Sequence, residues 1–157
     1  MRIVDEGHIR ATPARVFAAA RNVELWPTIL PHYRWVTTLE RHPDRAVVEM
    51  SANRPFGPLD WPTWWVSDMW VDEARHEVRY RHIRGVTRGM DVAWNIVPEG
   101  DGSHVTIIHE WDGPPWPLIR WITANWVIGP VFVHGIASRT LAGIRRSVET
   151  SGVVRTP

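Results

Sequence analysis

The sequence predicts an α+β fold in which a strongly curved antiparallel sheet of about seven strands wraps around a long C-terminal helix. Three observations support this prediction. From Tyr33 to Trp111 apolar and polar residues alternate with a period of two, as in strands that bury one face. From Leu118 to Thr150 the apolar residues recur at spacings of three to five, which indicates a helix. Two short helical segments separate the first strand from the others.

The N-terminal elements precede the regular part of the sheet. Residues 2–10 alternate loosely and predict the first strand. Thr12 and Pro13 then suit the N-cap and the first position of a short helix that runs to Arg21. A second short helix is expected over residues 23–30.

The remaining strands are expected at residues 33–40, 45–52, 63–72, 76–84, 89–97 and 104–111. The Pro/Gly-rich residues 53–62 are expected to form a loop long enough for a lid or a rim, and residues 112–117 form a second break. In the helix at 118–150 we expect a kink at Gly129–Pro130, because proline removes a backbone hydrogen bond. Only this helix is long enough to cover the apolar face of the sheet. The gap that a curved sheet leaves beneath it would hold a ligand.

Length and composition exclude several classes of function. A chain of 157 residues fits one domain, 1–157, that is large enough for a real core. The absence of cysteine excludes a disulfide scaffold, thiolate catalysis and a cysteine-ligated zinc. With 18 basic and 17 acidic residues, the chain has no long-range field that would hold nucleic acid. The 11 tryptophans suit either a bulky core or the wall of a cavity for a flat apolar ligand.

No targeting or membrane-spanning segment is visible in the sequence. Residues 1–10 lack the apolar stretch of a signal peptide. Residues 118–138 approach the length of a membrane span, but Arg120, His134 and the Gly129–Pro130 pair interrupt them. We therefore expect a cytoplasmic protein without stable membrane insertion.

Five segments, spread over nearly the whole chain, form distinctive motifs. They are Trp-Pro…Tyr at residues 26–33, Leu-Glu-Arg at 39–41, Trp-Val-Ser-Asp at 65–68, Met-x-x-x-Trp at 90–94 and a closing helix at 140–149. Together they resemble the polyketide aromatase/cyclases, a branch of the START-like helix-grip superfamily (SRPBCC) that includes the birch-pollen-allergen proteins. The resemblance implies a helix-grip fold with a hydrophobic cavity, and aldol cyclisation followed by dehydration without a cofactor.

Two pocket positions of that family can be compared with this sequence. Tyr33 stands where the family has a pocket tyrosine, whereas Met69 occupies the position of an arginine that the family uses in catalysis. Many members of the superfamily only bind ligands. The resemblance therefore indicates the fold more specifically than the reaction.

Strand parity predicts which side chains reach the cavity. If Leu39, Trp94 and Ile107 face it, so do the polar residues Tyr33, Thr37, Ser67, Tyr80, His82 and His109. A neutral histidine can remove a proton next to a carbonyl, and a tyrosine hydroxyl can polarise that carbonyl. The catalytic candidates are therefore His82 and His109 as bases and Tyr33 as donor. The ligand-binding candidates are Trp65, Ser67, Met69, Tyr80, Trp94, Trp121, Asn125 and Phe132. Trp61 and Trp116, in Pro-rich segments, are candidates for the rim of an entrance.

Each assignment has a structural alternative. A histidine on a strand is commonly a hydrogen-bonded structural residue, and a tryptophan on the cavity face can simply pack in the core. A basic run, balanced by Glu77 and Asp91, is expected to be a solvated strand face, or else to steer an acidic or carrier-bound substrate; it comprises Arg79, Arg81, Arg84 and Arg88. No helical His-x-x-x-His or His-Glu-x-x-His motif is present, and we expect neither a metal nor a cofactor.

The leading interpretation is a cavity that binds a hydrophobic, aromatic or polycyclic small molecule, with polyketide cyclase or dehydratase activity as its specific form. The alternative is a non-catalytic carrier or sensor for a lipid, a quinone or a similar ligand, which Met69 favours. A third interpretation, a stress or toxin-partner protein without a ligand, predicts a cavity filled by tryptophan side chains. The sequence leaves a homodimer and an acyl-carrier-bound substrate open as partners, and it argues against binding to nucleic acid.

Overall fold

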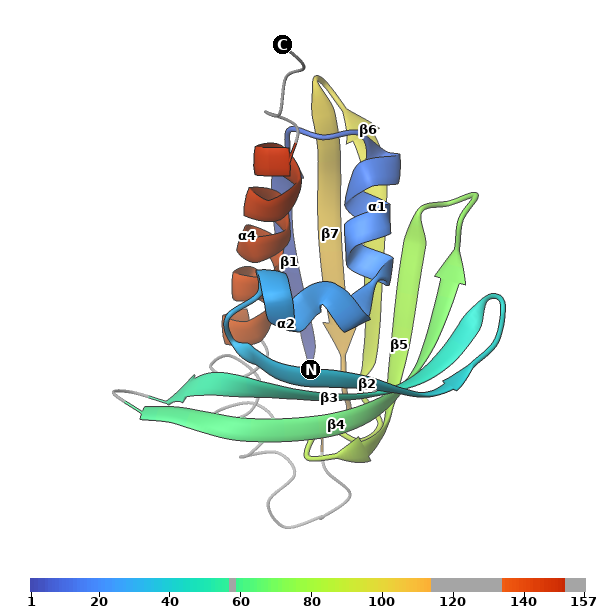
Figure 1. Cartoon of the computed structure of the whole chain (residues 1–157). Helices are drawn as coiled ribbons and strands as arrows, with labels where there is room; N and C mark the ends of the chain where they lie inside the picture. Colours follow the sequence, from blue (N-terminus) through green and yellow to red (C-terminus); the bar gives the residue numbers. More distant parts are fainter. Residues whose placement is uncertain (57–58, 114–133, 152–157) are drawn as a thin grey trace.

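In the described part of the chain, seven antiparallel strands form one curved sheet in the order β1-β7-β6-β5-β4-β3-β2 (Figure 1). The computed structural model describes residues 1–56, 59–113 and 134–151. Its strands are β1 (Arg2–Ile9), β2 (Tyr33–Arg41), β3 (Arg45–Phe56), β4 (Leu59–Asp72), β5 (Glu77–Gly85), β6 (Asp91–Glu99) and β7 (Gly102–Glu110). Its helical elements are α1 (Pro13–Arg21), the 3-10 turn η1 (Val23–Leu25), α2 (Trp26–Ile29) and α4 (His134–Ser151). The predicted α+β helix-grip fold is confirmed.

Strands β2 to β7 follow one another as an antiparallel meander, whereas β1 pairs with the last strand, β7. The chain therefore has to cross from one edge of the sheet to the other after β1, and α1, η1 and α2 form this crossing. Helices α1 and α4 lie side by side on the same face of the sheet, and α4 contacts β1 (Figure 1). At the start of α4, His134 Nδ1 lies 2.6 Å from a carboxylate oxygen of Asp5 on β1.

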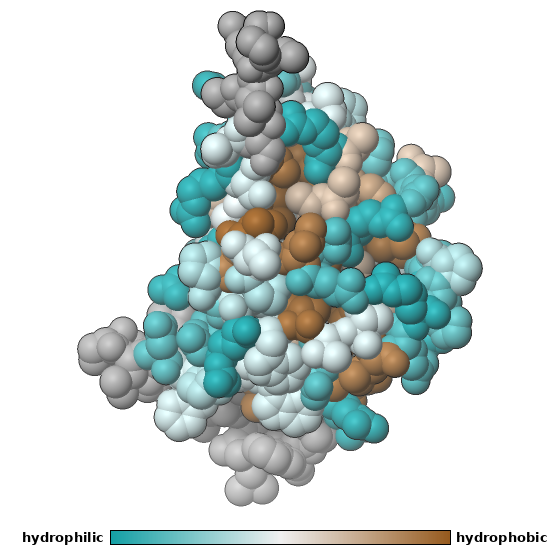
Figure 2. Space-filling view, viewed as in Figure 1, coloured by the Kyte–Doolittle hydropathy of each residue, from teal (hydrophilic) through white to brown (hydrophobic). Residues whose placement is uncertain are grey.

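The core lies between the sheet and the helices. Alternate strand residues point toward the helices, and α4 turns an apolar stripe toward the sheet. Each large apolar side chain that is fully buried contributes about 1.5–3 kcal/mol. In the face shown in Figure 2, apolar residues gather where α1, α2 and α4 meet, with hydrophilic residues around them. The largest side chains with almost no exposure include Ile9, Leu30, Met50, Ile96, Ile107 and Ile144.

The prediction of a loop over residues 53–62 is wrong, because β3 and β4 continue as a paired hairpin to Phe56 and Leu59. Proline is tolerated here for a topological reason. Beyond Ala52, β3 has lost its pairing with β2, and β4 pairs with β5 only from Trp65 onward. Among the described strands, each arm of this hairpin thus has a single neighbour, so the missing N–H of a proline need not break a second ladder.

The prediction that Thr37 and Leu39 face the cavity is also wrong. The pairing of β2 with β3 shifts by one residue between Tyr33 and Trp35, which leaves Arg34 as an extra residue. Such a bulge moves the side chains that follow it to the opposite face, here up to a second shift between Thr38 and Glu40. Thr37 is consequently exposed, and Leu39, the extra residue at the second shift, is 51% exposed.

The C-terminal helix is confirmed over α4. The rest of the predicted helix, including the Gly129–Pro130 kink, lies outside the described residues. The predicted second helix at 23–30 is observed as η1 followed by the four-residue α2. Among the described residues, no helix has the length and apolar character needed to cross a membrane.

Candidate functional site

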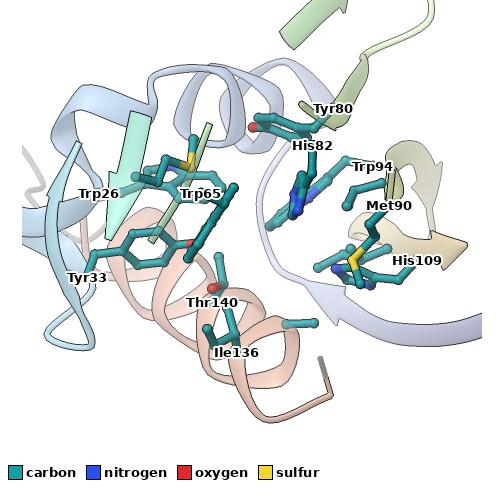
Figure 3. A pocket seen from close by; sticks show the side chains of 14 residues that line it. Trp26, Tyr33, Trp65, Tyr80, His82, Met90, Trp94, His109, Ile136 and Thr140 are labelled. Atoms are coloured by element: carbon teal, nitrogen blue, oxygen red, sulfur yellow. The ribbon is translucent and has the colours of Figure 1, made fainter. Parts of the chain in front are cut away.

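A small cavity lies between the concave face of the sheet and the helices α2 and α4 (Figure 3). Its volume is about 60 Å³. An engineered cavity that admits benzene measures roughly 150 Å³, so a ring system can enter this one only when wall side chains move. The described residues that line it are Trp26, Tyr33, Met50, Trp65, Tyr80, His82, Met90, Val92, Trp94, Ile107, His109, Ile136, Ala137 and Thr140.

The sheet fixes the positions of the polar wall residues. Tyr80 on β5 pairs with Val92 on β6, which in turn pairs with His109 on β7. These three side chains therefore form one row across the inner face of the sheet. His82 follows on β5, three residues before the strand ends, and its backbone N–H donates to Met90 while its carbonyl accepts from Gly89.

Aromatic rings cover one side of the cavity in a connected series. The ring of Trp26 contacts that of Tyr33 at a centroid distance of 5.1 Å and that of Trp94 at 5.8 Å. Tyr33 then contacts Trp65 at 6.2 Å, and Trp65 stacks on His82 at 5.7 Å. The indole N–H of Trp26 donates to the backbone oxygen of Ala19 on α1, which anchors this member of the series.

Two of the cavity's polar side chains are oriented by neighbours. His82 Nδ1 lies 2.7 Å from the hydroxyl of Thr87, which is buried in the turn between β5 and β6. On the opposite side, the Thr140 hydroxyl of α4 lies 3.0 Å from His32 Nε2. Burial, together with Arg139 and Arg146, lowers the pKa of His32 to about 4, so this histidine is neutral near pH 7.

The structure places six of the predicted site residues on the cavity wall: Tyr33, Trp65, Tyr80, His82, Trp94 and His109. Tyr33 lies on one side and His109 on the other, with His82 between them (Figure 3). A base and a donor at these positions would act on separated parts of a ligand.

The other predicted site residues lie elsewhere. Ser67 is fully buried on the same face but is not a lining residue. Met69 lines a separate cavity of about 80 Å³ near η1 and the β2–β3 turn. Trp61 is on β4 and 60% exposed rather than in a loop. Trp116, Trp121, Asn125 and Phe132 lie outside the described residues.

Three members of the basic run, Arg79, Arg81 and Arg84, lie on β5, and Arg88 lies in the turn that follows it. On β5 the run forms the solvated face that the sequence predicts. Arg79 pairs with Glu77, and Arg81 pairs with Asp91, and both arginines are largely exposed. Within the described part of the chain, no group of histidine and carboxylate side chains is arranged to hold a metal ion.

Several lining residues did not follow from sequence reasoning. Trp26 and Thr140 come from helices, and their places depend on how those helices dock. A signal was present for Thr140, which lies four residues after Ile136 on the same helical stripe. Met50 could have been found from the alternation of β3, because it shares a face with Val48.

The model of a family described as polyketide cyclase/dehydrase and lipid transport matches residues 1–149. Among solved structures, the aromatase/cyclase Zhui from a Streptomyces species has a TM-score of 0.85 at 16% identity, over 98% of this chain and 96% of that one. The protein TTHA0849 from Thermus thermophilus has a TM-score of 0.80 at 18% identity, over 96% and 99% of the two chains. A STAR-related lipid transfer protein from Xanthomonas axonopodis has a TM-score of 0.65 at 17% identity, over 94% and 85%. No curated protein sequence matches this chain.

Proposed function

Because the chain belongs to the polyketide cyclase/dehydrase and lipid transport family, we propose that its cavity binds a small hydrophobic molecule with a flat, aromatic or polycyclic ring system. The observation behind the proposal is the composition of the wall, where three tryptophans and two tyrosines meet and no described lining residue carries a permanent charge. Stacked and edge-to-face ring pairs add about 0.5–1.5 kcal/mol to the gain from burying apolar area. We place this function in a single cytoplasmic domain.

A cavity-filling substitution tests the proposal. Ala137 is buried and lines the cavity, whereas Ala142 on the same helix is exposed. We expect the wild type to bind 2-naphthol in a calorimetric titration, and Ala137→Leu to bind it at least roughly tenfold more weakly, because the added carbons occupy space that the ligand needs. Ala142→Leu is the matched control and should bind like the wild type. Equal affinities in all three proteins would place the ligand outside this cavity.

The presence of three groups that can transfer or donate protons favours a catalytic form of this function. Tyr33, His82 and His109 line one cavity. In an aldol cyclisation, a histidine would take a proton from the carbon beside a carbonyl, and the enolate carbon would bond to a second carbonyl carbon. The resulting alkoxide would receive a proton from tyrosine. In the dehydration, the tyrosinate would take a second proton from the same α-carbon, and the histidinium would protonate the hydroxyl, so that a C=C bond forms, water leaves and both side chains return to their starting states.

Turnover of a linear poly-β-ketone separates this form from a carrier or sensor, which Met69 at the family's arginine position favours. Removing a general base typically costs a factor of about 10²–10⁴ in rate. We expect His109→Ala to lose cyclised product to that extent while still binding 2-naphthol. An unchanged product distribution in His109→Ala would rule out a role for this histidine, and binding without turnover in the wild type would identify a carrier.

A further inference from the structure

The hydroxyl of Tyr80 is a buried polar group for which the fold supplies no partner among the described residues. Tyr80 lies on β5 between Met69 on β4 and Val92 on β6, and only 6% of the residue is exposed. Within the described part of the chain, no hydrogen-bond partner reaches its oxygen. Buried polar atoms in folded proteins are nearly always paired, because an unpaired one loses its bonds to water without replacement.

Two other polar side chains of the wall differ from Tyr80 in this respect. His82 is paired with Thr87, and Thr140 is paired with His32. The Tyr80 ring projects into the cavity with its oxygen directed toward the side where Tyr33 and Trp65 lie (Figure 3). The oxygen is itself buried, so a ligand that moves the wall side chains aside would reach this hydroxyl and use its free hydrogen-bonding capacity.

The environment defines what that molecule presents to Tyr80. Burial raises the pKa of Tyr80 well above its ordinary value, and the nearby Tyr33 raises it further, so the hydroxyl keeps its proton and can donate it. The described wall holds no arginine, lysine or carboxylate. An anionic acceptor would thus be buried without an opposite charge, which is costly, whereas a neutral carbonyl oxygen is not.

We propose that Tyr80 is the hydrogen-bond donor for a neutral carbonyl oxygen of the ligand, so that the cavity selects ketones, aldehydes or quinones over hydrocarbons and carboxylates of the same shape. This inference rests on the proposed function, because it concerns the ligand of the same cavity. It assigns to Tyr80 the recognition of an oxygen atom, in addition to the ring contacts made by the tryptophans.

A pair of isosteric probes tests the inference. Acetophenone and α-methylstyrene differ only in that a C=O replaces a C=CH₂ group, and ligand-observed NMR gives the affinity of each. We expect Tyr80→Phe to reduce the preference for the ketone over the alkene by roughly three- to tenfold, the effect of one net hydrogen bond. Binding of the alkene should stay within about twofold of the wild type. The melting temperature of ligand-free Tyr80→Phe should be unchanged or raised, since no structural bond is lost.

Each alternative outcome has a defined meaning. A preference that falls in Tyr33→Phe but not in Tyr80→Phe would assign the donor to Tyr33 and overturn the inference. Benzoate binding as tightly as acetophenone would overturn the selection for neutral oxygen. A markedly lower melting temperature in Tyr80→Phe would show that the hydroxyl has a structural partner, which also overturns it. If neither probe binds the folded wild type, the proposed function fails together with the inference; if both bind and the preference does not change, only the inference fails.

Discussion

Acidification should destabilise this fold through one buried histidine, His32. The residue is 9% exposed, and its Nε2 lies 3.0 Å from the hydroxyl of Thr140. Burial is the main reason why its pKa falls to about 4, and the positive charges of Arg139 and Arg146 lower the pKa further. Protonation of His32 would place a third positive charge beside these arginines, in a pocket that Asp60 also lines.

The sign and size of the effect follow from the two pKa values. The unfolded chain takes up the proton near pH 6.5, whereas the folded chain takes it up only near pH 4. The stabilisation is therefore complete above pH 6.5 and is lost as the pH falls toward 4. The difference of about 2.5 between the two pKa values corresponds to roughly 3 kcal/mol in the free energy of unfolding. About 2 kcal/mol of this stability is lost between pH 7 and pH 5.

Urea unfolding of the wild type and His32→Gln at pH 7 and pH 5 measures this loss. Glutamine keeps a polar group near Thr140 but does not titrate. The free energy of unfolding of the wild type should fall by about 2 kcal/mol more than that of the variant. Other groups cancel in this comparison, including Asp5, whose raised pKa acts in the opposite direction. Equal losses in the two proteins would refute the argument.

Two further substitutions test a tight backbone contact at Gly102 and a buried hydrogen bond at Thr87. A Cβ at Gly102 would lie 2.1 Å from the backbone oxygen of Ile9 on β1. Gly102→Ala should therefore lower the free energy of unfolding, measured in urea titrations, by about 2 kcal/mol or more. Gly100 has open space around it, so the control Gly100→Asn should have a free energy of unfolding within about 1 kcal/mol of the wild type. A tolerated Gly102→Ala would show that β1 and β7 can separate at this point. Thr87→Val should lower the free energy of unfolding by about 1–3 kcal/mol, because it leaves the buried Nδ1 of His82 without the hydroxyl. Thr87→Ser keeps the hydroxyl and should recover most of this stability. Equal stabilities of the two variants would contradict the role of this hydrogen bond.

Strand periodicity predicted the fold and much of the cavity wall where the ladders are regular. Tyr80, Trp94 and His109 face inward as alternation requires, because β5, β6 and β7 pair without a register shift through these residues. The same reasoning failed on β2, where the extra residue Arg34 reverses the parity of the residues up to Thr38 and a second shift follows at Leu39. A bulge depends on the pairing of two strands, and neither strand contains a separate sequence signal for it.

The parts of the site contributed by helices were harder to predict, for a related reason. Trp26 reaches the cavity because the short α2 packs against β2, and Thr140 does so because α4 docks beside α2. Periodicity identifies the apolar stripe of a helix but not the part of the stripe that lies over a cavity. Met69 shows the same limit for a strand residue. Its side chain is buried on the inner face of the sheet, as alternation predicts, but it lines the second cavity rather than the first.

The polarity of the cavity wall argues against the interpretation in which the tryptophans merely fill a core. That interpretation predicts a filled interior, and the small free volume of about 60 Å³ agrees with it. A core needs only apolar rings, however, and each buried hydroxyl or imidazole costs free energy unless it is paired. This wall contains two tyrosines and two histidines, and the hydroxyl of Tyr80 has no partner among the described residues. Phenylalanine at position 80 would pack equally well and avoid that cost. A protein that keeps a destabilising hydroxyl at this point is therefore better explained by a ligand whose oxygen completes the hydrogen bond.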